Sequence, residues 1–462
     1  MTRKLFGTDG VRGVINVELV PETALRLSLA VGTYFNSGSK ILIGRDCRAG
    51  SELIANAVIA GLLSSGLRVY YAGLVPTPAL QYYIKNSDFD GGVMVTASHN
   101  PPEYCGIKVI MGDGVEAPRD VERELEEAFW DQRFRRVSWR GLGVGCRRIY
   151  DVNDFYVNGI LELIDTERIR SSKFKVVVDP VNNTASLTSP KLLRKLGIKV
   201  FTVNADISHI PGRNPEPTPE SLAETSAVVK AIKADFGIAH DGDGDRAIFI
   251  DDTGNVLPGD YSAVMLCRHI LEHRGDRGPR RIVTAVSSST LIEEILKDYN
   301  VEVIWTKVGS IVIARTMMRI GALAGFEENG GFMYPPHQYV RDGGMALALM
   351  LEFLSFERRK LSEIYMDMPK RYLVKTKVPL ADRGKVSVII NELRQVFSGR
   401  RIIDIDGIKV ISRDYWFLVR PSGTEPVVRI FVEGSTREVA SKVLNELNNL
   451  VRRVLEDEVR SS

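Results

Sequence analysis

Three aspartates alternate with glycines in one short segment of the chain, Asp241-Gly-Asp-Gly-Asp-Arg246. Because alternate residues of an extended segment point the same way, Asp241, Asp243 and Asp245 are expected to converge on one point. Converging carboxylates repel each other unless a cation lies between them, and such oxygen ligands suit Mg²⁺ or a similar hard ion. A calcium EF-hand loop is disfavoured, because its sixth position is glycine and here it is Arg246. The segment predicts a metal site rather than a solvated acidic loop.

A second segment, Thr96-Ala-Ser-His-Asn-Pro-Pro102, directly follows an apolar strand predicted at Gly92–Val95. Loops at the carboxyl end of a parallel strand are where α/β folds place ligands. Ser98 is therefore a candidate nucleophile and His99 a candidate acid–base partner. A plain turn rich in Ser, Asn and Pro explains the same residues equally well. The segment is not a G-x-S-x-G elbow, which disfavours an acyl hydrolase.

Three other segments could bind anions or sugars, although ordinary polar turns are consistent with each. Arg420-Pro-Ser-Gly-Thr-Glu-Pro426, followed by Arg429, combines two guanidinium groups with backbone N–H groups that suit a phosphate. Gly325-Phe-Glu-Glu-Asn-Gly-Gly331 offers carboxylate and amide side chains, which are the usual readers of sugar hydroxyls. Phe6–Gly13 packs three glycines around Arg12 and could bring that arginine near an anion.

Composition sets the class of protein. A chain of 462 residues is too long for a single hydrophobic core, so several domains are expected. The 61 basic and 58 acidic residues leave a net charge of +3, which indicates neither a nucleic acid nor a membrane as partner. No apolar run approaches the roughly 18 residues of a membrane span, and the first residues lack the apolar core of a signal peptide. Four widely spaced cysteines without a C-x-x-C pair fit a reducing compartment, so we expect a cytoplasmic protein.

The elements around these segments form a weak repeat. Short apolar strands alternate with helical periodicity, which favours βα units with mostly parallel sheets. Three copies of strand, helix, second strand and apolar segment before a polar loop are expected in residues 1–150, 151–253 and 254–368. Residues 369–462 have fewer crossovers and predict a smaller α+β domain. The expected strands are Ile41–Gly44, Gly92–Val95, Lys175–Val178 and Arg281–Ala285, and the expected helices include Pro21–Tyr34, Thr218–Ile232 and Asp342–Leu354.

In their order along the chain, GTDGVRG, TASHNP, DGDGDR and RPSGTEP resemble the α-D-phosphohexomutase family over essentially the whole sequence. The resemblance implies four domains around a central cleft, with three related α/β copies and a smaller α+β domain. It implies an enzyme that interconverts hexose 1-phosphates and hexose 6-phosphates through a phosphoserine and a 1,6-bisphosphate. The implied cofactors are Mg²⁺ and hexose 1,6-bisphosphate as activator, the partners are sugar phosphates, and we expect a monomer or a homodimer.

The resemblance also implies roles for individual residues. Ser98 would carry the transferable phosphate, and this phosphate together with the three aspartates would hold Mg²⁺. Arg12 and Arg246 would lie beside that phosphate, and Lys108 resembles the family's active-site lysine. The remaining implied contacts are with the substrate: the sugar at Glu327 and Asn329, and its non-reacting phosphate at Arg420, Ser422, Gly423, Thr424 and Arg429.

Three features of the sequence bear on how closely it follows the family pattern. Gly331 stands where the family's E-x-S-G-H loop has a histidine, so the general base could be Lys108, His99 or His337. Cys105 replaces an asparagine and is interpreted as a packing residue. The loop Arg213–Glu220 is similar to phosphomannomutases and phosphoglucomutases, whereas the opening KLFGTDGVRG favours glucosamine mutases. The preferred sugar therefore stays open.

Two other functions are possible. A phosphatase would let water attack the phosphoserine, but it has less need of a second phosphate site. A non-catalytic sugar-phosphate sensor would be expected to lack Ser98 or one of the aspartates, and all of them are present. A hinge at residues 367–372, which would let the last domain move, is a further hypothesis.

Overall fold

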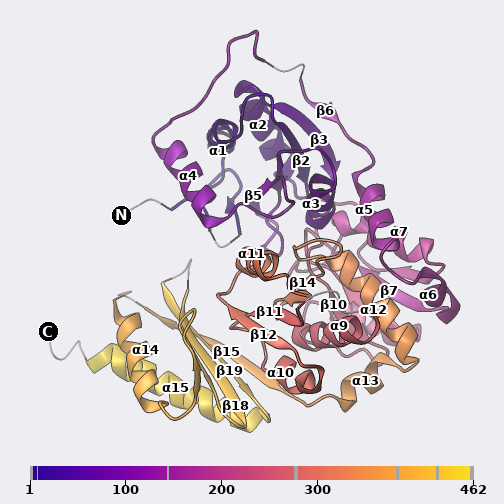
Figure 1. Ribbon diagram of the computed structural model, residues 1–462, viewed down its shortest axis with the longest axis vertical. Helices are drawn as coiled ribbons and strands as arrows, with labels where there is room; N and C mark the ends of the chain where they lie inside the picture. Colours follow the sequence, from indigo (N-terminus) through magenta and orange to yellow (C-terminus); the bar gives the residue numbers. More distant parts are fainter. Residues whose placement is uncertain are drawn as a thin grey trace.

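The computed structural model describes residues 4–7, 9–142, 145–274, 279–380, 384–422 and 426–457. These residues form four separate sheets with their helices (Figure 1). The first three sheets combine parallel and antiparallel pairs, and the fourth is antiparallel throughout. The predicted fold class, with three α/β units and one smaller α+β unit, is confirmed. The boundaries at residues 150, 253 and 368 stay a prediction.

The first unit is built on a sheet of six strands in the order β1-β5-β4-β2-β3-β6. The strands are β1 (Val11–Val14), β2 (Lys40–Arg45), β3 (Arg68–Leu74), β4 (Gly91–Val95), β5 (Tyr104–Met111) and β6 (Arg147–Arg148). The helices are α1 (Pro21–Tyr34), α2 (Ser51–Ser64), α3 (Thr77–Lys85) and α4 (Arg119–Trp130). Helix α1 begins at Pro21, as predicted, because proline has no N–H to satisfy in a first turn.

The second and third units each have a sheet of four strands. The strands of the second are β7 (Lys175–Asp179), β8 (Lys199–Thr202), β9 (Phe236–Ala239) and β10 (Ile248–Asp251). Those of the third are β11 (Arg281–Ala285), β12 (Glu302–Thr306), β13 (Ala324–Phe326) and β14 (Phe332–Met333). Their helices are α5 (Val152–Leu161), α6 (Thr166–Ser172), α7 (Ser189–Lys195), α8 (Ala223–Ala231), α9 (Gly259–His273), α10 (Leu291–Ile295), α11 (Ser310–Ile320), α12 (Gly343–Glu357) and α13 (Leu361–Asp367).

The weak repeat predicted from the sequence is a topological repeat. The strand orders β3-β2-β4-β5, β8-β7-β9-β10 and β12-β11-β13-β14 are the same arrangement, in which the first strand of each copy lies between the second and the third. The third and fourth strands pair antiparallel in every copy. The polar loop after the third strand therefore occupies an equivalent place each time. It carries Ser98 after β4, Asp241 after β9 and Glu327 after β13.

One predicted helix begins later than expected. The pattern predicts a helix from Thr218, whereas α8 begins at Ala223. The Ser221 hydroxyl donates to the backbone oxygen of Glu216 (2.7 Å) and accepts from the backbone N–H of Thr218 (2.9 Å). Such short side-chain bonds to the backbone replace the first turn of a helix.

The fourth unit, yellow in Figure 1, packs beside the third. Its sheet has the order β15-β19-β18-β17-β16, and Trp416 and Phe431 from it form a buried cluster with Val286 of the third unit. The strands are β15 (Tyr372–Pro379), β16 (Arg401–Ile403), β17 (Ile408–Ile411), β18 (Tyr415–Pro421) and β19 (Val427–Gly434). The helices are α14 (Lys385–Val396) and α15 (Arg437–Asp457). Among the helices in the described ranges, none combines the length and the apolar character of a membrane span.

A buried carboxylate, Asp342, joins the first three units just before α12. It accepts hydrogen bonds from the backbone N–H of Met345 (2.8 Å), from Gln338 Nε2 (2.6 Å) and from the Tyr156 hydroxyl, and it faces His337 Nδ1 at 2.9 Å. His337 stacks on Tyr82 of the first unit, with ring centroids 4.2 Å apart. Burial opposes the charge on Asp342, but His337 and these donors outweigh it and lower the pKa.

Replacing this carboxylate should destabilise the fold. Asp342→Ala leaves its buried donors without an acceptor, so we expect the free energy of unfolding to fall by about 3–5 kcal/mol. Because the pKa of Asp342 is lowered in the fold, its contribution is present above the ordinary carboxyl pKa of 3.8 and is lost on acidification. Urea unfolding followed by circular dichroism measures the change. The exposed Asp298→Ala is the control and should alter stability by less than about 0.5 kcal/mol. Equal stability of the two variants at pH 7 would contradict the account.

Candidate active site

Ser98 is fully buried in a strained turn after β4. Its φ of 50° is rare for a residue with a side chain, and such strain is held only when surrounding groups fix it. Its backbone N–H donates to Thr96 Oγ1 (2.9 Å), and Thr96 donates to Asp46 (2.7 Å). Arg48, itself paired with Asp46 at 3.1 Å, donates to the backbone oxygens of Ser98 and two following residues. The turn is therefore a fixed scaffold that presents one hydroxyl.

The Ser98 hydroxyl points at the loop after β9. It donates to Asp241 Oδ2 at 2.6 Å, so the first and second units meet at this bond. The backbones are equally close, because a Cβ on Gly242 would lie 2.3 Å from the backbone oxygen of Ser98. Only glycine fits there. The loop that carries Ser98 therefore contacts the loop that carries Asp241.

The three aspartates form a pocket of oxygen atoms. One carboxylate oxygen from each of Asp241, Asp243 and Asp245 lies within 4.8 Å of the others, and all three side chains are buried. Among the described residues, Asp243 Oδ1 and Asp245 Oδ1 are buried with no hydrogen-bond partner. Orphaned buried carboxylate oxygens at this spacing fit a hard divalent cation. The type, spacing and burial of these oxygen atoms therefore fit a metal site.

The pKa values of the aspartates reflect the same crowding. Burial, and then the charges of Asp245 and Asp243, raise the pKa of Asp241 to about 8. Burial also opposes the charge on Asp243, but Lys108 and a hydrogen bond from Thr77 Oγ1 (2.7 Å) outweigh it and lower the pKa. Neighbouring cations therefore decide which carboxylate stays charged.

Lys108 is the main cation that compensates Asp243. Its ammonium is buried and lies 3.1 Å from Asp243, 3.3 Å from Asp9 and 3.7 Å from Asp245. Arg12 pairs with Asp9 at 2.6 Å and also donates to Asn100 Oδ1. Both predicted cations therefore belong to the set of side chains that hydrogen bonds and ion pairs link to Ser98, which we call the Ser98 network.

Arg246 and His99 also lie close to Ser98 and its aspartate partner. Arg246 donates to His99 Nδ1 (2.8 Å) and pairs with Glu216 at 2.9 Å, while His99 Nδ1 is 3.4 Å from Ser98 Oγ. Burial and the Arg246 charge lower the pKa of His99 to about 2, so the ring is neutral at pH 7. Glu216, in the loop that precedes α8, contacts both Arg246 and His99.

Arg341 belongs to the same network and was not predicted. It lies between β14 and α12 and contacts Asp245, Glu327 and Asp9, one carboxylate from each of the first three units. Nothing in the local sequence Tyr-Val-Arg-Asp-Gly-Gly marks it as a site residue. Asp9, Asp46, Thr77 and Glu216 were also missed, because each has at least one partner in the site that is far away in the chain.

His337, one of the candidate bases, lies elsewhere. Its ring is fully buried between Tyr82 and Asp342 in the joint between units, and its described contacts do not include the Ser98 network. The remaining sequence candidates, Lys108 and His99, do lie there.

The predicted sugar and phosphate residues lie in the third and fourth units. Glu327 is buried and bonded to Arg341 (3.0 Å), and Asn329 is partly exposed. Arg420 and Arg429 are directly opposite each other on β18 and β19, and Arg420 pairs with Asp406 at 2.9 Å. Ser422 is buried, whereas Gly423 and Thr424 lie outside the described residues.

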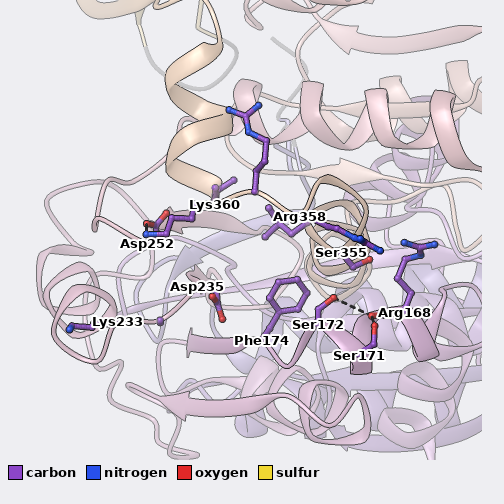
Figure 2. Close-up of a pocket in the computed structure, with 14 residues that line it drawn as sticks. Arg168, Ser171, Ser172, Phe174, Lys233, Asp235, Asp252, Ser355, Arg358 and Lys360 are labelled. Atoms are coloured by element: carbon purple, nitrogen blue, oxygen red, sulfur yellow. Dashed lines mark hydrogen bonds and ion pairs between the residues drawn. The ribbon is translucent and has the colours of Figure 1, made fainter.

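A cavity of 660 Å³ between the second and third units is distinct from this network. Figure 2 shows Lys360 and Asp252 beside each other on its wall, where they pair at 3.6 Å. Arg359 of the same wall is bonded to Asp367 at 2.6 Å. Lys360 and Arg359 are thus each paired with a carboxylate, and the lining residues include neither Ser98 nor the three aspartates.

The comparison with family models identifies the chain. Four models match successive parts: phosphoglucomutase/phosphomannomutase alpha/beta/alpha domain I over residues 3–136, domain II over 154–254, domain III over 258–372 and the C-terminal domain over 374–450. Fold and site define a four-domain phosphohexomutase. The chain belongs to the phosphoglucomutase/phosphomannomutase family.

Relatives and a solved structure agree. A phosphoglucosamine/phosphogalactosamine mutase of Sulfurisphaera tokodaii is 50% identical over 97% of this chain and 99% of the relative. A phosphoglucomutase/phosphomannomutase of Thermococcus kodakarensis is 40% identical over 96% and 97% of the two chains. The crystal structure of a phosphoglucomutase/phosphomannomutase family protein of Burkholderia thailandensis matches with a TM-score of 0.85 and 25% identity over 97% of each chain.

Thr77 offers a test of the metal pocket that leaves every aspartate in place. Thr77→Val keeps the shape but removes the hydrogen bond that orients Asp243, so we expect about tenfold weaker binding of Mg²⁺. Calorimetric titration with MgCl₂ measures the affinity. Thr33→Val on α1 is the control and should bind as the wild type does. Unchanged affinity in Thr77→Val would show that this bond does not position Asp243.

Proposed function

We propose that this phosphohexomutase transfers a phosphate between the O1 and O6 atoms of a hexose phosphate through Ser98. The observation that carries the proposal is the 2.6 Å bond from the Ser98 hydroxyl to Asp241, beside two more buried aspartates and a ring of cations. Phosphoryl transfer depends mainly on positioning and on neutralising charge, and this network supplies both.

The proposed metal is Mg²⁺, held by Asp241, Asp243 and Asp245 together with the phosphate on Ser98. The three carboxylates are hard oxygen donors, and their orphaned oxygens support this assignment. When bound, the ion would stabilise negative charge on the transferring phosphate and on the serine oxygen.

The protein's own residues would carry the rest of the reaction. A sugar hydroxyl forms a new P–O bond as the bond from phosphorus to Ser98 Oγ breaks, which yields a hexose 1,6-bisphosphate. Arg12, Arg246 and Lys108 would balance the phosphate charge. After the bisphosphate turns over, its other phosphate passes to Ser98 Oγ and the isomeric monophosphate leaves. Added hexose 1,6-bisphosphate would act as activator by phosphorylating Ser98.

A general base must take the proton of the attacking hydroxyl. His337 is enclosed in the joint between units, and the Lys108 ammonium is surrounded by carboxylates. His99 is 35% exposed and lies beside Ser98. Its position and access favour His99 over the other two candidates, although its Nδ1 accepts a hydrogen bond from Arg246 and its lowered pKa makes the neutral ring a weak base.

The fourth unit would hold the phosphate that does not react. Arg420 and Arg429 are on facing positions of adjacent strands, so both guanidinium groups can address one anion. We assign Ser422, Gly423 and Thr424 to the same phosphate, and Glu327 and Asn329 to the sugar hydroxyls. A second phosphate site favours a mutase over a phosphatase, which needs none.

We propose hexosamine phosphates as the first substrates to examine. The relative with 50% identity is named a phosphoglucosamine/phosphogalactosamine mutase. The relative with 40% identity is named for glucose and mannose phosphates, so these sugars belong in the same assay.

The proposed function predicts turnover that depends on Ser98. A coupled assay with Mg²⁺ and catalytic hexose 1,6-bisphosphate would be run on glucosamine 6-phosphate, glucose 1-phosphate and mannose 1-phosphate. We expect turnover of at least one sugar and, since the acceptor of the phosphate is gone, at least a thousandfold loss (roughly what a missing nucleophile costs) in Ser98→Ala. Ser87→Ala, on a loop far from the network, is the control. No turnover with a phosphorylated Ser98 and bound Mg²⁺ would favour the sensor instead.

A further inference from the structure

Gly331 and Arg341 share one small space at the end of the sugar loop. A Cβ on Gly331 would lie 2.4 Å from Arg341 Cδ and 2.8 Å from its Cγ. Such distances are far inside van der Waals contact, so a side chain at position 331 and the stem of Arg341 exclude each other. The stem of Arg341 therefore fills the space that a side chain at position 331 would need.

The end of Arg341 is fixed by carboxylates on three segments. Its Nη1 donates to Glu327 at 3.0 Å, and its Nη2 lies 2.5 Å from Asp245 and 3.3 Å from Asp9. Its side chain is only 6% exposed. A planar guanidinium presents its donors to two carboxylates in a rigid fork, whereas a lysine ammonium is a point charge on a flexible stem.

The backbone around Arg341 leaves it little freedom. The next residue, Asp342, is bonded through its backbone to Phe332 (2.9 Å) and through its side chain to four groups. On the opposite side, the backbone of Glu327 donates to the backbone oxygen of Gly331 at 2.9 Å. Both ends of the contact between Arg341 and the sugar loop are therefore anchored.

We propose that Arg341 is a positioning residue that takes the place of a side chain at Gly331 and holds Glu327 of the sugar loop at a fixed distance from Asp245 of the metal loop. This inference rests on the proposed function, because it assigns Glu327 to the sugar and Asp245 to the metal. It also means that position 331 supplies no acid or base, and that the sugar loop is tied to the metal loop before substrate arrives.

The first test removes the guanidinium. In Arg341→Ala we expect kcat to fall about 100-fold and KM for the sugar phosphate to rise, because both loops lose their common anchor. Arg341→Lys keeps the charge but not the fork, so it should stay close to the alanine variant. Arg274→Ala removes another paired arginine, one bonded to Glu352 outside the network, and should keep the wild-type kcat. Recovery of wild-type kinetics by Arg341→Lys would overturn the positioning role.

The second test asks whether position 331 and the Arg341 stem compete for the same space. Gly331→Ala alone should lower both Tm and kcat, since its methyl group collides with the Arg341 stem. In the Arg341→Ala background, which lacks Cγ and Cδ, the nearest remaining neighbour of that methyl group is Asn329 Oδ1 at 3.3 Å, so the same substitution should lower Tm and kcat much less. Effects of Gly331→Ala that are equal in the two backgrounds would overturn the proposal. The Tm arm needs no turnover, and an inactive wild type would refute the proposed function instead, so the two failures are distinguishable.

Discussion

The repulsion among buried carboxylates is the constraint around which this molecule is organised. Asp241, Asp243 and Asp245 lie within 4.8 Å of one another, and Asp9 and Glu327 join them through shared cations. Burying such charges without compensation would cost several kcal/mol for each ion. Four cations, Lys108, Arg12, Arg246 and Arg341, compensate these charges. Among the described residues, Asp243 Oδ1 and Asp245 Oδ1 still lack a hydrogen-bond donor, which fits a metal site.

The repeat explains how these charges come together. Each α/β unit places a polar loop after its third strand, and the three units orient these loops towards one another. The serine, the metal ligands and the sugar loop thus come from three copies of one arrangement. Asp342 and its partners fix the joint between the copies, so the geometry of the site depends on the packing of whole units rather than on any single loop.

Some elements could be predicted from the sequence, because short local patterns determine them. The strand before Ser98 and the proline start of α1 lie where they were expected. The three aspartates converge as predicted, but through a turn with a positive φ at Gly244 rather than through the extended segment that the prediction assumed. Arg341 could not be predicted, since its partners are far away in the sequence and its neighbours form no motif. The late start of α8 was missed because Ser221 competes for backbone hydrogen bonds.

The central claim is that one phosphate moves from Ser98 to a sugar and that another returns. Its most direct test is a single-turnover chase, in which enzyme carrying radiolabelled phosphate on Ser98 is mixed with unlabelled hexose 6-phosphate. The account predicts that the label leaves Ser98, appears first in hexose 1,6-bisphosphate and then in hexose 1-phosphate. Release of the label as inorganic phosphate, or its retention on Ser98 while the sugar turns over, would contradict the account.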